Sequence, residues 1–378
     1  MIRLAAMRDA LLPALARAIQ APAGGDPNHV LILQPDHLGD IILSVPAVRL
    51  LREKLPDARL TAVVGPWSAQ ITRIAWQVDD VIEVDFPGFN RGQPPAKLTA
   101  PYRQIERDAE RLRVLGAGRA VILRDDAWWA TALARASVSE DVIAAADRRN
   151  EPFATITTHL DDESHRTERA LALAAILLRL RMGRIEQLEW DMSPRIAATN
   201  IQREAGLEAL SHHGIQGQYI ALHPGAGAAV KTWPEGNWRA LIRKLSDQRF
   251  VLTGNDDEAP LCRRIAEDLP NAVSVAGETT LDGLIGILDG ARLAVGTDNG
   301  PMHLGAALGT PTVRLYGPSN PRIYGPPPGA RGHHVITASW RCPRCEDLSP
   351  GRPMCGCMTA IKVDDVVPVV ERVLADDA

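Results

Sequence analysis

Along the first part of the chain, the pattern of apolar residues alternates between that of a buried strand and that of a helix. The continuous apolar run "HVLILQ" (29–34) has the length of a buried strand, and the apolar residues of "IILSVPAVRLLREKLP" after it recur at helical spacing. Strands and helices that alternate in this way are typical of a parallel sheet covered by helices. Further strands are predicted at 59–65, 81–85 and 120–124, with helices at 67–76, near 101–116 and from about 126.

A second alternation of the same kind begins near residue 218, with the apolar runs "YIALH", "RFVLTG", "AVSVAG", "RLAVGT" and "TVRLYG". The stretch 184–217 that separates the two alternations is polar and less regular. We therefore expect an α/β protein with two Rossmann-like domains, whose parallel sheets face a central cleft at the carboxyl ends of the strands. The expected divisions are an extension at 1–27, a first domain at 28–190, a linker at 191–217, a second domain at 218–360 and a C-terminal helix at 361–378.

The first 25 residues are apolar but do not resemble an export signal. Arg3, Arg8, Asp9 and Arg17 interrupt the apolar positions and Pro13 lies among them, which predicts an amphipathic helix. Such a helix either packs on the body of the protein or contacts a membrane surface. No apolar run approaches the roughly 18 residues of a spanning helix. We expect a cytoplasmic protein, with peripheral contact at the inner membrane as a further alternative.

Composition narrows the class of protein. Of 378 residues, 46% are hydrophobic and 23% are charged, which is typical of a soluble globular α/β protein. The formal net charge of −4 argues against broad nucleic-acid binding, so no nucleic-acid partner is expected.

The stretch "HPGAGAAVKTW" (223–233) follows a predicted strand and raises the question of a phosphate site. Counted from Gly225, Val230 stands where a P-loop needs its second glycine, and also where a G-x-G-x-x-G fingerprint needs its third. What is left is a strand end with two glycines, free N–H groups and the cation of Lys231, all suited to a bound phosphate. The alternative is a glycine turn beside a solvated lysine.

A second strand end, in "AVGTDNGPMHLG", has similar chemistry. Pro301 suits the first position of a helix, and the N-terminus of that helix would favour an anion near Thr297 and Gly300. His303 falls in the first turn. The alternative is a capped helix without a ligand.

The first strand end adds a carboxylate, since "LQPDHLGD" places Asp40 where the loop becomes a helix and Gly39 permits a tight turn. A helix N-terminus would keep Asp40 ionised, as a general base must be. An N-cap without a catalytic role is the alternative. Asp36 and His37 are nearby candidates for the same role.

Three stretches together resemble one family. "VLILQPDHLGDIILSVPAVRLLREKLPDARLTAVV", "IALHPGAGAAVKTWPEGNWRALIRKL" and "VGTDNGPMHLGAALGTPTVRLYGPSNP" are similar to motifs of the family 9 glycosyltransferases, the ADP-heptose:lipopolysaccharide heptosyltransferases and their relatives. The resemblance extends from about residue 28 over nearly the whole chain. It implies a GT-B fold in which the first domain binds the acceptor and the second binds the nucleotide sugar. It also implies inversion at the anomeric carbon without a catalytic metal.

The same resemblance implies roles for individual residues. Asp40 matches the family's base for the acceptor hydroxyl, and Lys231 matches a lysine that neutralises charge on the diphosphate leaving group. Glu258 is expected to contact the ribose, with Asp257 as the close alternative. The remaining donor-binding residues are expected to be His223, Gly225, Gly227, Thr297, Asp298, Asn299, Gly300 and His303.

The acceptor side is predicted from residue types. Arg91 and Lys97 in a long loop suit a phosphorylated lipid A core, while Asp125 and Trp128 follow the fourth strand. Tryptophan faces commonly stack on sugars, although buried packing of Trp128 and Trp129 is the alternative. A glycan or lipid-linked acceptor is therefore expected.

Four cysteines form the pattern C-x2-C-x9-C-x-C within 342–357, and a fifth, Cys262, lies alone in a predicted helix. In a reducing compartment such a cluster suggests a metal site before it suggests disulfides. Some relatives in the family bind iron at a cluster here, so we expect a structural zinc or iron ion, with free thiols as the alternative. The cluster consists of Cys342, Cys345, Cys355 and Cys357.

The sequence thus predicts an inverting, metal-independent glycosyltransferase that needs no cofactor for catalysis and uses a nucleotide-activated sugar, with ADP-heptose first among donors. One alternative is a transferase of the same fold with a protein or natural-product acceptor. Another is a non-catalytic sugar-nucleotide-binding protein, which the presence of Asp40 and Lys231 disfavours. A nicotinamide oxidoreductase is disfavoured because a complete G-x-G-x-x-G follows neither first strand.

Overall fold

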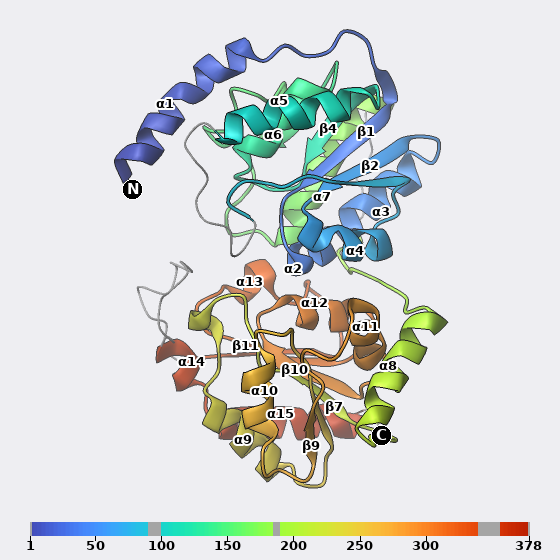
Figure 1. Cartoon of the computed structure of the whole chain (residues 1–378), viewed down its shortest axis with the longest axis vertical. Helices are drawn as coiled ribbons and strands as arrows, with labels where there is room; N and C mark the ends of the chain where they lie inside the picture. Colours follow the sequence, from blue (N-terminus) through green and yellow to red (C-terminus); the bar gives the residue numbers. More distant parts are fainter. Residues whose placement is uncertain (1, 90–99, 184–189, 339–355, 377–378) are drawn as a thin grey trace. The chain divides into compact units, whose positions relative to one another are not determined.

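The computed structural model describes residues 2–89, 100–183, 190–338 and 356–376, and it divides into two compact units, Met1–Met192 and Ser193–Ala378 (Figure 1). Within the described residues, each unit contains one six-stranded sheet whose strand pairs are parallel. The α/β architecture expected from the alternating pattern is confirmed in both units.

The first sheet has the strand order β3-β2-β1-β4-β5-β6. Strand β1 (Asp26–Gln34), at the centre of the sheet, is buried on both faces, which explains why its residues "VLIL" form a continuous apolar run. Helices α5 and α6 pack together on one face, and α3 and α7 pack together on the other (Figure 1). The strands are β1 (Asp26–Gln34), β2 (Arg59–Val64), β3 (Asp80–Glu83), β4 (Ala117–Ile122), β5 (Val142–Ala145) and β6 (Ile156–Thr158). The helices are α1 (Ile2–Ala18), α2 (Leu38–Leu43), α3 (Val45–Lys54), α4 (Pro66–Ala75), α5 (Ala100–Arg113), α6 (Trp128–Ser137) and α7 (Arg166–Met182).

The N-terminal helix α1 packs on the first unit through its later turns. Leu12 is buried in the core with α5 and α6, and Asp9 forms an ion pair with Arg148 at 2.7 Å. Leu11 on the same helix is 57% exposed. Among the described residues, no helix is both long and apolar enough to cross a bilayer.

The second sheet repeats the topology of the first, with the order β12-β11-β10-β7-β8-β9. Read in chain order within each unit, both sheets have the Rossmann order 3-2-1-4-5-6. The strands are β7 (Ile220–His223), β8 (Phe250–Leu252), β9 (Ala272–Ser274), β10 (Leu293–Thr297), β11 (Thr312–Tyr316) and β12 (His333–Thr337). The helices are α8 (Asn200–His212), the 3-10 turn η1 (Ala229–Lys231), α9 (Glu235–Lys244), α10 (Ala259–Ala266), α11 (Leu281–Asp289), α12 (Gly300–Ala307), α13 (Pro321–Tyr324), α14 (Gly356–Ala360) and α15 (Val363–Asp376).

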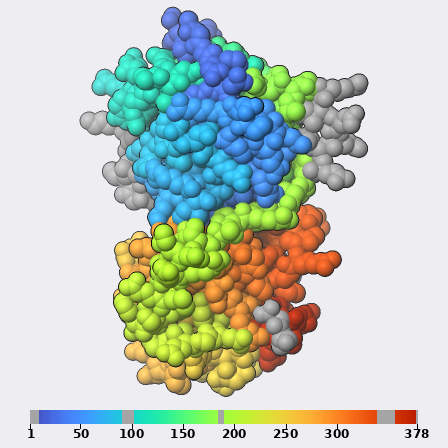
Figure 2. Space-filling model, turned by 90° about the vertical axis from the view of Figure 1, so that its right-hand side faces the viewer, coloured from blue at the N-terminus to red at the C-terminus, as the bar shows by residue number. Residues whose placement is uncertain are grey.

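The segment 191–217, expected as a linker, contains helix α8. A capping box between Thr199 and Gln202 starts this helix, which then packs closely on α11. A Cβ on Gly286 would lie 2.0 Å from a backbone oxygen of α8, so glycine is what permits this close crossing. Figure 2 shows α8 in yellow-green on the surface of the second unit.

The C-terminal helix α15 belongs to the second unit. It packs against α9 and β12, and Val366, Val370 and Val373 are buried in that unit's core. The apolar spacing of "VDDVVPVVERVLADD" therefore reflects packing on the second unit, which the sequence predicts to bind the nucleotide sugar.

Candidate active site

Several of the residues predicted to form the site follow the strands at the switch points of the two sheets. In the first sheet, the strand order reverses between β1 and β4, and in the second it reverses between β7 and β10. Ligands of open parallel sheets bind outside the carboxyl ends of strands at such points. Asp40 and Asp125 follow β1 and β4, while Gly225 and Asp298 follow β7 and β10.

Asp40 lies in the first turn of α2, three residues after the N-cap residue His37. It is therefore not the N-cap itself, which was the structural alternative for this residue. A carboxylate in the first turn is stabilised in its charged form by the helix dipole. Its side chain is 30% exposed, so a hydroxyl group of a substrate can reach it.

Arg166, the first residue of α7, joins Asp40 to two other carboxylates. Its Nε lies 3.7 Å from Asp40 Oδ1, its Nη1 donates to Asp125 Oδ2 at 2.9 Å, and its Nη2 lies 3.9 Å from Asp36 Oδ2. Arg124, which follows β4, pairs closely with Asp36. We call Asp36, Asp40, Asp125, Arg124, Arg166 and Arg169 the carboxylate–arginine cluster.

The charges in this cluster support one another. Burial alone would lower the pKa of Arg166, but Asp40, Asp125 and Asp36 together raise it. Burial likewise opposes the charge of Arg124, whose pKa Asp36, Asp126 and Asp40 raise. Both guanidiniums are thus permanent cations beside Asp40.

The other residues predicted on the acceptor side fall into three groups. Asp125 already pairs with Arg166 and, at 2.6 Å, with Arg169. Trp128 is half-buried, and its ring lies 6.4 Å from the ring of Phe153 at the edge of the core. Arg91 and Lys97 lie outside the described residues.

In the second unit, Lys231 and His303 converge on Asp298. Lys231 Nζ lies 2.6 Å from Asp298 Oδ2, and His303 Nε2 lies 3.4 Å from Asp298 Oδ1. Burial would raise the pKa of Asp298, but Lys231 and His303 hold it well below its usual range. Asp298 is therefore a buried anion that orients the lysine and the histidine.

His303 is a neutral imidazole whose tautomer is set by its neighbours. Burial lowers its pKa, so the ring is uncharged at neutral pH. Arg314 Nη1 lies 3.3 Å from His303 Nδ1 and can only donate, which leaves the proton on Nε2 for Asp298. The buried Arg314 thus fixes the donor atom of His303.

Asn299 ties the two strand-end loops together. Its Nδ2 donates to the carbonyl of Gly225 at 2.8 Å, and its Oδ1 accepts from the Met302 N–H as the N-cap of α12. Thr297 Oγ1 donates to the same Gly225 carbonyl at 3.2 Å. Asn299 and Thr297 therefore shape the loop, and Asn299 is also the N-cap of α12.

Glu258 lies directly beside Gly225. A Cβ at residue 225 would fall 1.9 Å from Glu258 Oε1, so only glycine leaves room for this carboxylate. Glu258 Oε2 accepts from the Asn255 N–H at 2.9 Å and lies 3.6 Å from His223 Nε2. Burial lowers the pKa of His223, whose Nδ1 lies 3.0 Å from Thr253 Oγ1. Gly227 is exposed in the same loop.

Of the predicted cysteine cluster, only Cys357 is among the described residues, where it is buried in α14. Cys342, Cys345 and Cys355 lie outside them. In the part of the chain that the structure describes, no group of three or more His, Cys, Asp or Glu residues could hold a metal ion.

Sequence reasoning missed the arginines of the site. Arg166 is separated from Asp40 by more than a hundred residues, and α7 was not among the predicted helices. Two signals were available: an arginine at a helix start opposes the helix dipole, and Arg314 is a charged residue inside the apolar strand "TVRLY".

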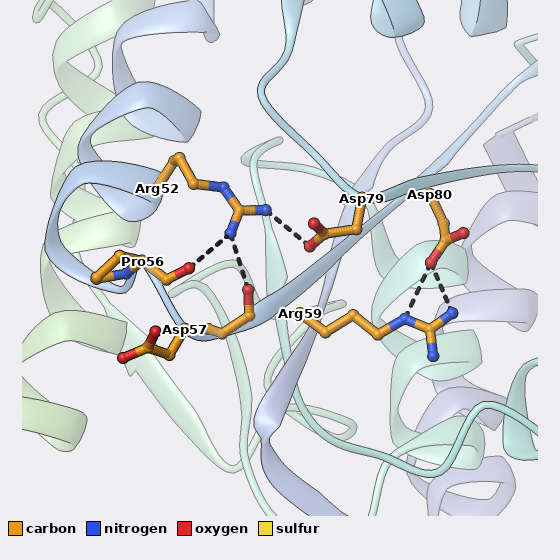
Figure 3. A pocket seen from close by; sticks show the side chains of 7 residues that line it. Arg52, Pro56, Asp57, Arg59, Asp79 and Asp80 are labelled. Atoms are coloured by element: carbon orange, nitrogen blue, oxygen red, sulfur yellow. Dashed lines mark hydrogen bonds and ion pairs between the residues drawn. The ribbon is translucent and has the colours of Figure 1, made fainter.

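A shallow hollow of about 450 Å³ lies at the amino ends of β2 and β3 (Figure 3). Arg52 donates to Asp79 at 2.7 Å and to the carbonyls of Pro56 and Ala58, and Arg59 pairs with Asp80. Arg52 and Arg59 thus bind the segments that line the hollow itself. The hollow is at the opposite edge of the sheet from Asp40. We assign it a structural role.

Comparison with known proteins identifies the family. The model of glycosyltransferase family 9 (heptosyltransferase) matches residues 113–350, and the chain belongs to this family. It is therefore a glycosyltransferase. Lipopolysaccharide heptosyltransferase 1 of Escherichia coli is 26% identical over 305 residues, which cover 78% of this chain and 90% of that relative.

Solved structures share the fold. The glycosyl transferase family 9 protein of Veillonella parvula superposes with a TM-score of 0.74 at 20% identity, covering 94% of this chain and 100% of that one. Escherichia coli heptosyltransferase WaaC with ADP-2-deoxy-2-fluoro heptose gives 0.66 at 21% identity, covering 91% and 99%. The iron-containing dodecameric glycosyltransferase TibC of enterotoxigenic E. coli gives 0.52 at 14% identity, covering 94% and 78%. The GT-B fold predicted from the three motifs is confirmed.

Proposed function

We propose that this protein transfers heptose from ADP-heptose to a lipopolysaccharide-type acceptor, with inversion at the anomeric carbon and without a catalytic metal. The observation that carries the proposal is the convergence of Lys231, His303 and Asp298 at the β7/β10 switch point. Family membership and the relatives named above support the donor and the acceptor class.

The second unit binds the donor in this proposal. Lys231 leaves Asp298 for the diphosphate and neutralises the charge that develops as the glycosidic bond breaks. Glu258 Oε1, beside Gly225, accepts hydrogen bonds from the ribose hydroxyls. Asn299 and Thr297 keep the glycine loop in place, with Gly227 and Gly300 giving the phosphates access to backbone N–H groups.

The first unit supplies the base. Asp40 takes the proton of the acceptor hydroxyl, the acceptor oxygen forms a bond to the anomeric carbon, and ADP leaves with the electron pair of the broken C–O bond. One displacement of this kind inverts the configuration. Arg91, Lys97, Asp125 and Trp128 remain our candidates for holding the acceptor.

Location and metal content are part of the same proposal. We place the reaction in the cytoplasm, and α1, which packs on the first unit through Leu12, is the candidate element for peripheral contact with the inner membrane. We propose a structural zinc or iron ion at Cys342, Cys345, Cys355 and Cys357, with the iron-containing neighbour TibC as the reason to measure iron. Elemental analysis of protein purified without chelator tests this, and the absence of bound metal would contradict it.

A thermal-shift comparison of ADP, UDP, GDP and their sugar conjugates tests the donor. A ligand of the native state raises the melting temperature by mass action. We expect shifts with ADP and ADP-heptose alone. A larger shift with UDP or GDP would move the donor to another nucleotide, and no shift with any of them would favour a protein that does not use nucleotide sugars.

A further inference from the structure

We propose that Arg166 is a positioning residue for Asp40, acting on the general base from the neighbouring helix. This inference rests on the role proposed above for Asp40. No motif of the sequence marked Arg166, and the proposal comes from its contacts in the folded chain.

The helices that carry the two residues are fixed to each other. Thr167, next to Arg166, donates through Oγ1 to the carbonyl of Leu43 at the end of α2, at 2.8 Å. Helix α7 also packs against α2 and α3. The guanidinium therefore approaches Asp40 from a helix that is held against α2 and α3.

The location of Arg166 is unfavourable for a purely structural residue. It is the first residue of α7, where a cation opposes the helix dipole, and its side chain is only 9% exposed. A buried cation in such a place must be offset by anions. Asp36, Asp40 and Asp125 supply them, so the placement links Arg166 to the catalytic edge of the sheet.

The distances distinguish Asp40 from its neighbours. Asp125 accepts hydrogen bonds from Arg166 and Arg169 at 2.9 and 2.6 Å, and Asp36 is buried beside Arg124. The Arg166 to Asp40 separation of 3.7 Å is too long for a strong hydrogen bond, so here the guanidinium acts through its charge. Asp40 thus lies beside a cation, and its side chain, which is 30% exposed, is accessible to a hydroxyl.

Among the described residues, other charged side chains also lie in the region of Asp40. Asp36 and Arg124 face it from the loops after β1 and β4, and Arg169 on α7 is paired with Asp125. The cations of the helices packed against α2 pair elsewhere: Arg49 with Asp191, Arg52 with Asp79 and Arg73 with Glu83. Removing Arg166 should therefore change the ionisation of Asp40.

The test is the pH dependence of kcat/KM for Arg166→Met. An opposite charge within 4–6 Å lowers a carboxylate pKa by about 1–3 units, so we expect the acidic limb to move up by about 1–3 pH units. Activity should recover at high pH, and the KM for ADP-heptose should stay unchanged. Arg166→Lys should keep most of the wild-type profile, and Arg73→Met, which breaks an exposed ion pair in the same unit, is the matched control.

Asp125→Asn supplies a second variant in case Arg166→Met does not fold. It removes an anion that competes for Arg166, so the acidic limb should move to lower pH, in the opposite direction. If Arg166→Met is folded and the acidic limb of its kcat/KM profile lies at the same pH as in the wild type, the proposal is overturned. If Arg166→Met is unfolded, an acidic limb at the wild-type pH in Asp125→Asn overturns it. Wild-type activity in Asp40→Asn would instead refute the base, which separates the two failures.

Discussion

Replacing Lys231 by methionine should destabilise the second unit in a pH-dependent way. Lys231 Nζ lies 2.6 Å from Asp298, whose side chain is 5% exposed, and the substitution leaves that carboxylate with a neutral His303. Removing one partner of a buried ion pair costs about 3–5 kcal/mol. Because Lys231 itself is 19% exposed, we expect the lower end, about 3 kcal/mol.

The change should be visible in thermal unfolding. For a domain of the size of the second unit, each kcal/mol changes Tm by about 2–4 °C, so the variant should melt about 6–12 °C lower at pH 7. The double variant Lys231→Met/Asp298→Asn, which removes both charges, should recover much of this loss. The energies of the single variants should therefore not add.

The sign of the pH dependence follows from Asp298. Its pKa in the folded protein is depressed, because Lys231 and His303 outweigh burial. A depressed carboxylate contributes stability that is present above its unfolded pKa of about 3.9 and is lost as the pH falls toward the folded pKa. In Lys231→Met the pKa of Asp298 rises, so protonation relieves the buried charge. The difference in Tm between the wild type and Lys231→Met should have its full size at pH 7 and should become smaller toward pH 4. A difference independent of pH, or additive single variants, would refute the reasoning.

Two glycine substitutions and one buried thiol provide three further tests of the packing. Gly286→Ala should lower the free energy of unfolding by about 1–3 kcal/mol in a urea titration, because its Cβ meets backbone of α8, whereas Gly236→Ala in open space should cost nothing. Gly225→Ala should weaken ADP binding in calorimetry with little loss of Tm, since the methyl group displaces the flexible Glu258 carboxylate. The Cys262 thiol should resist alkylation at pH 8 until the protein unfolds, as followed by peptide mass spectrometry, because burial raises its pKa to about 12.

Elements with strong local patterns could be predicted from the sequence. The strands at 29–34 and 220–223 are continuous apolar runs, and the loops after them carry glycine, aspartate and lysine at strand ends. These signals are local, so residue order alone places Asp40, Lys231 and Asp298 at the sheet edges. Trp128 was ambiguous, because an aromatic side chain has the same sequence signal whether it binds a sugar or packs in a core.

Contacts between distant segments could not be predicted. The polar surface of α8 resembled a linker, because only the side that meets α11 is buried and glycine leaves no apolar signature there. Arg166 and Arg314 form part of the site only because α7 meets α2 and β11 lies beside β10. The spacing of residues in a single sequence does not indicate contacts between segments that are this far apart in the chain.

The most direct test of the account is transfer of heptose from ADP-heptose to a lipopolysaccharide core acceptor in the presence of EDTA, measured for the wild type and Asp40→Asn. We predict acceptor-dependent release of ADP by the wild type and none by Asp40→Asn, with equal ADP affinity in the two proteins. Transfer by Asp40→Asn at the wild-type rate would contradict the assigned base, and a wild type inactive until a divalent metal is restored would contradict metal-independent catalysis.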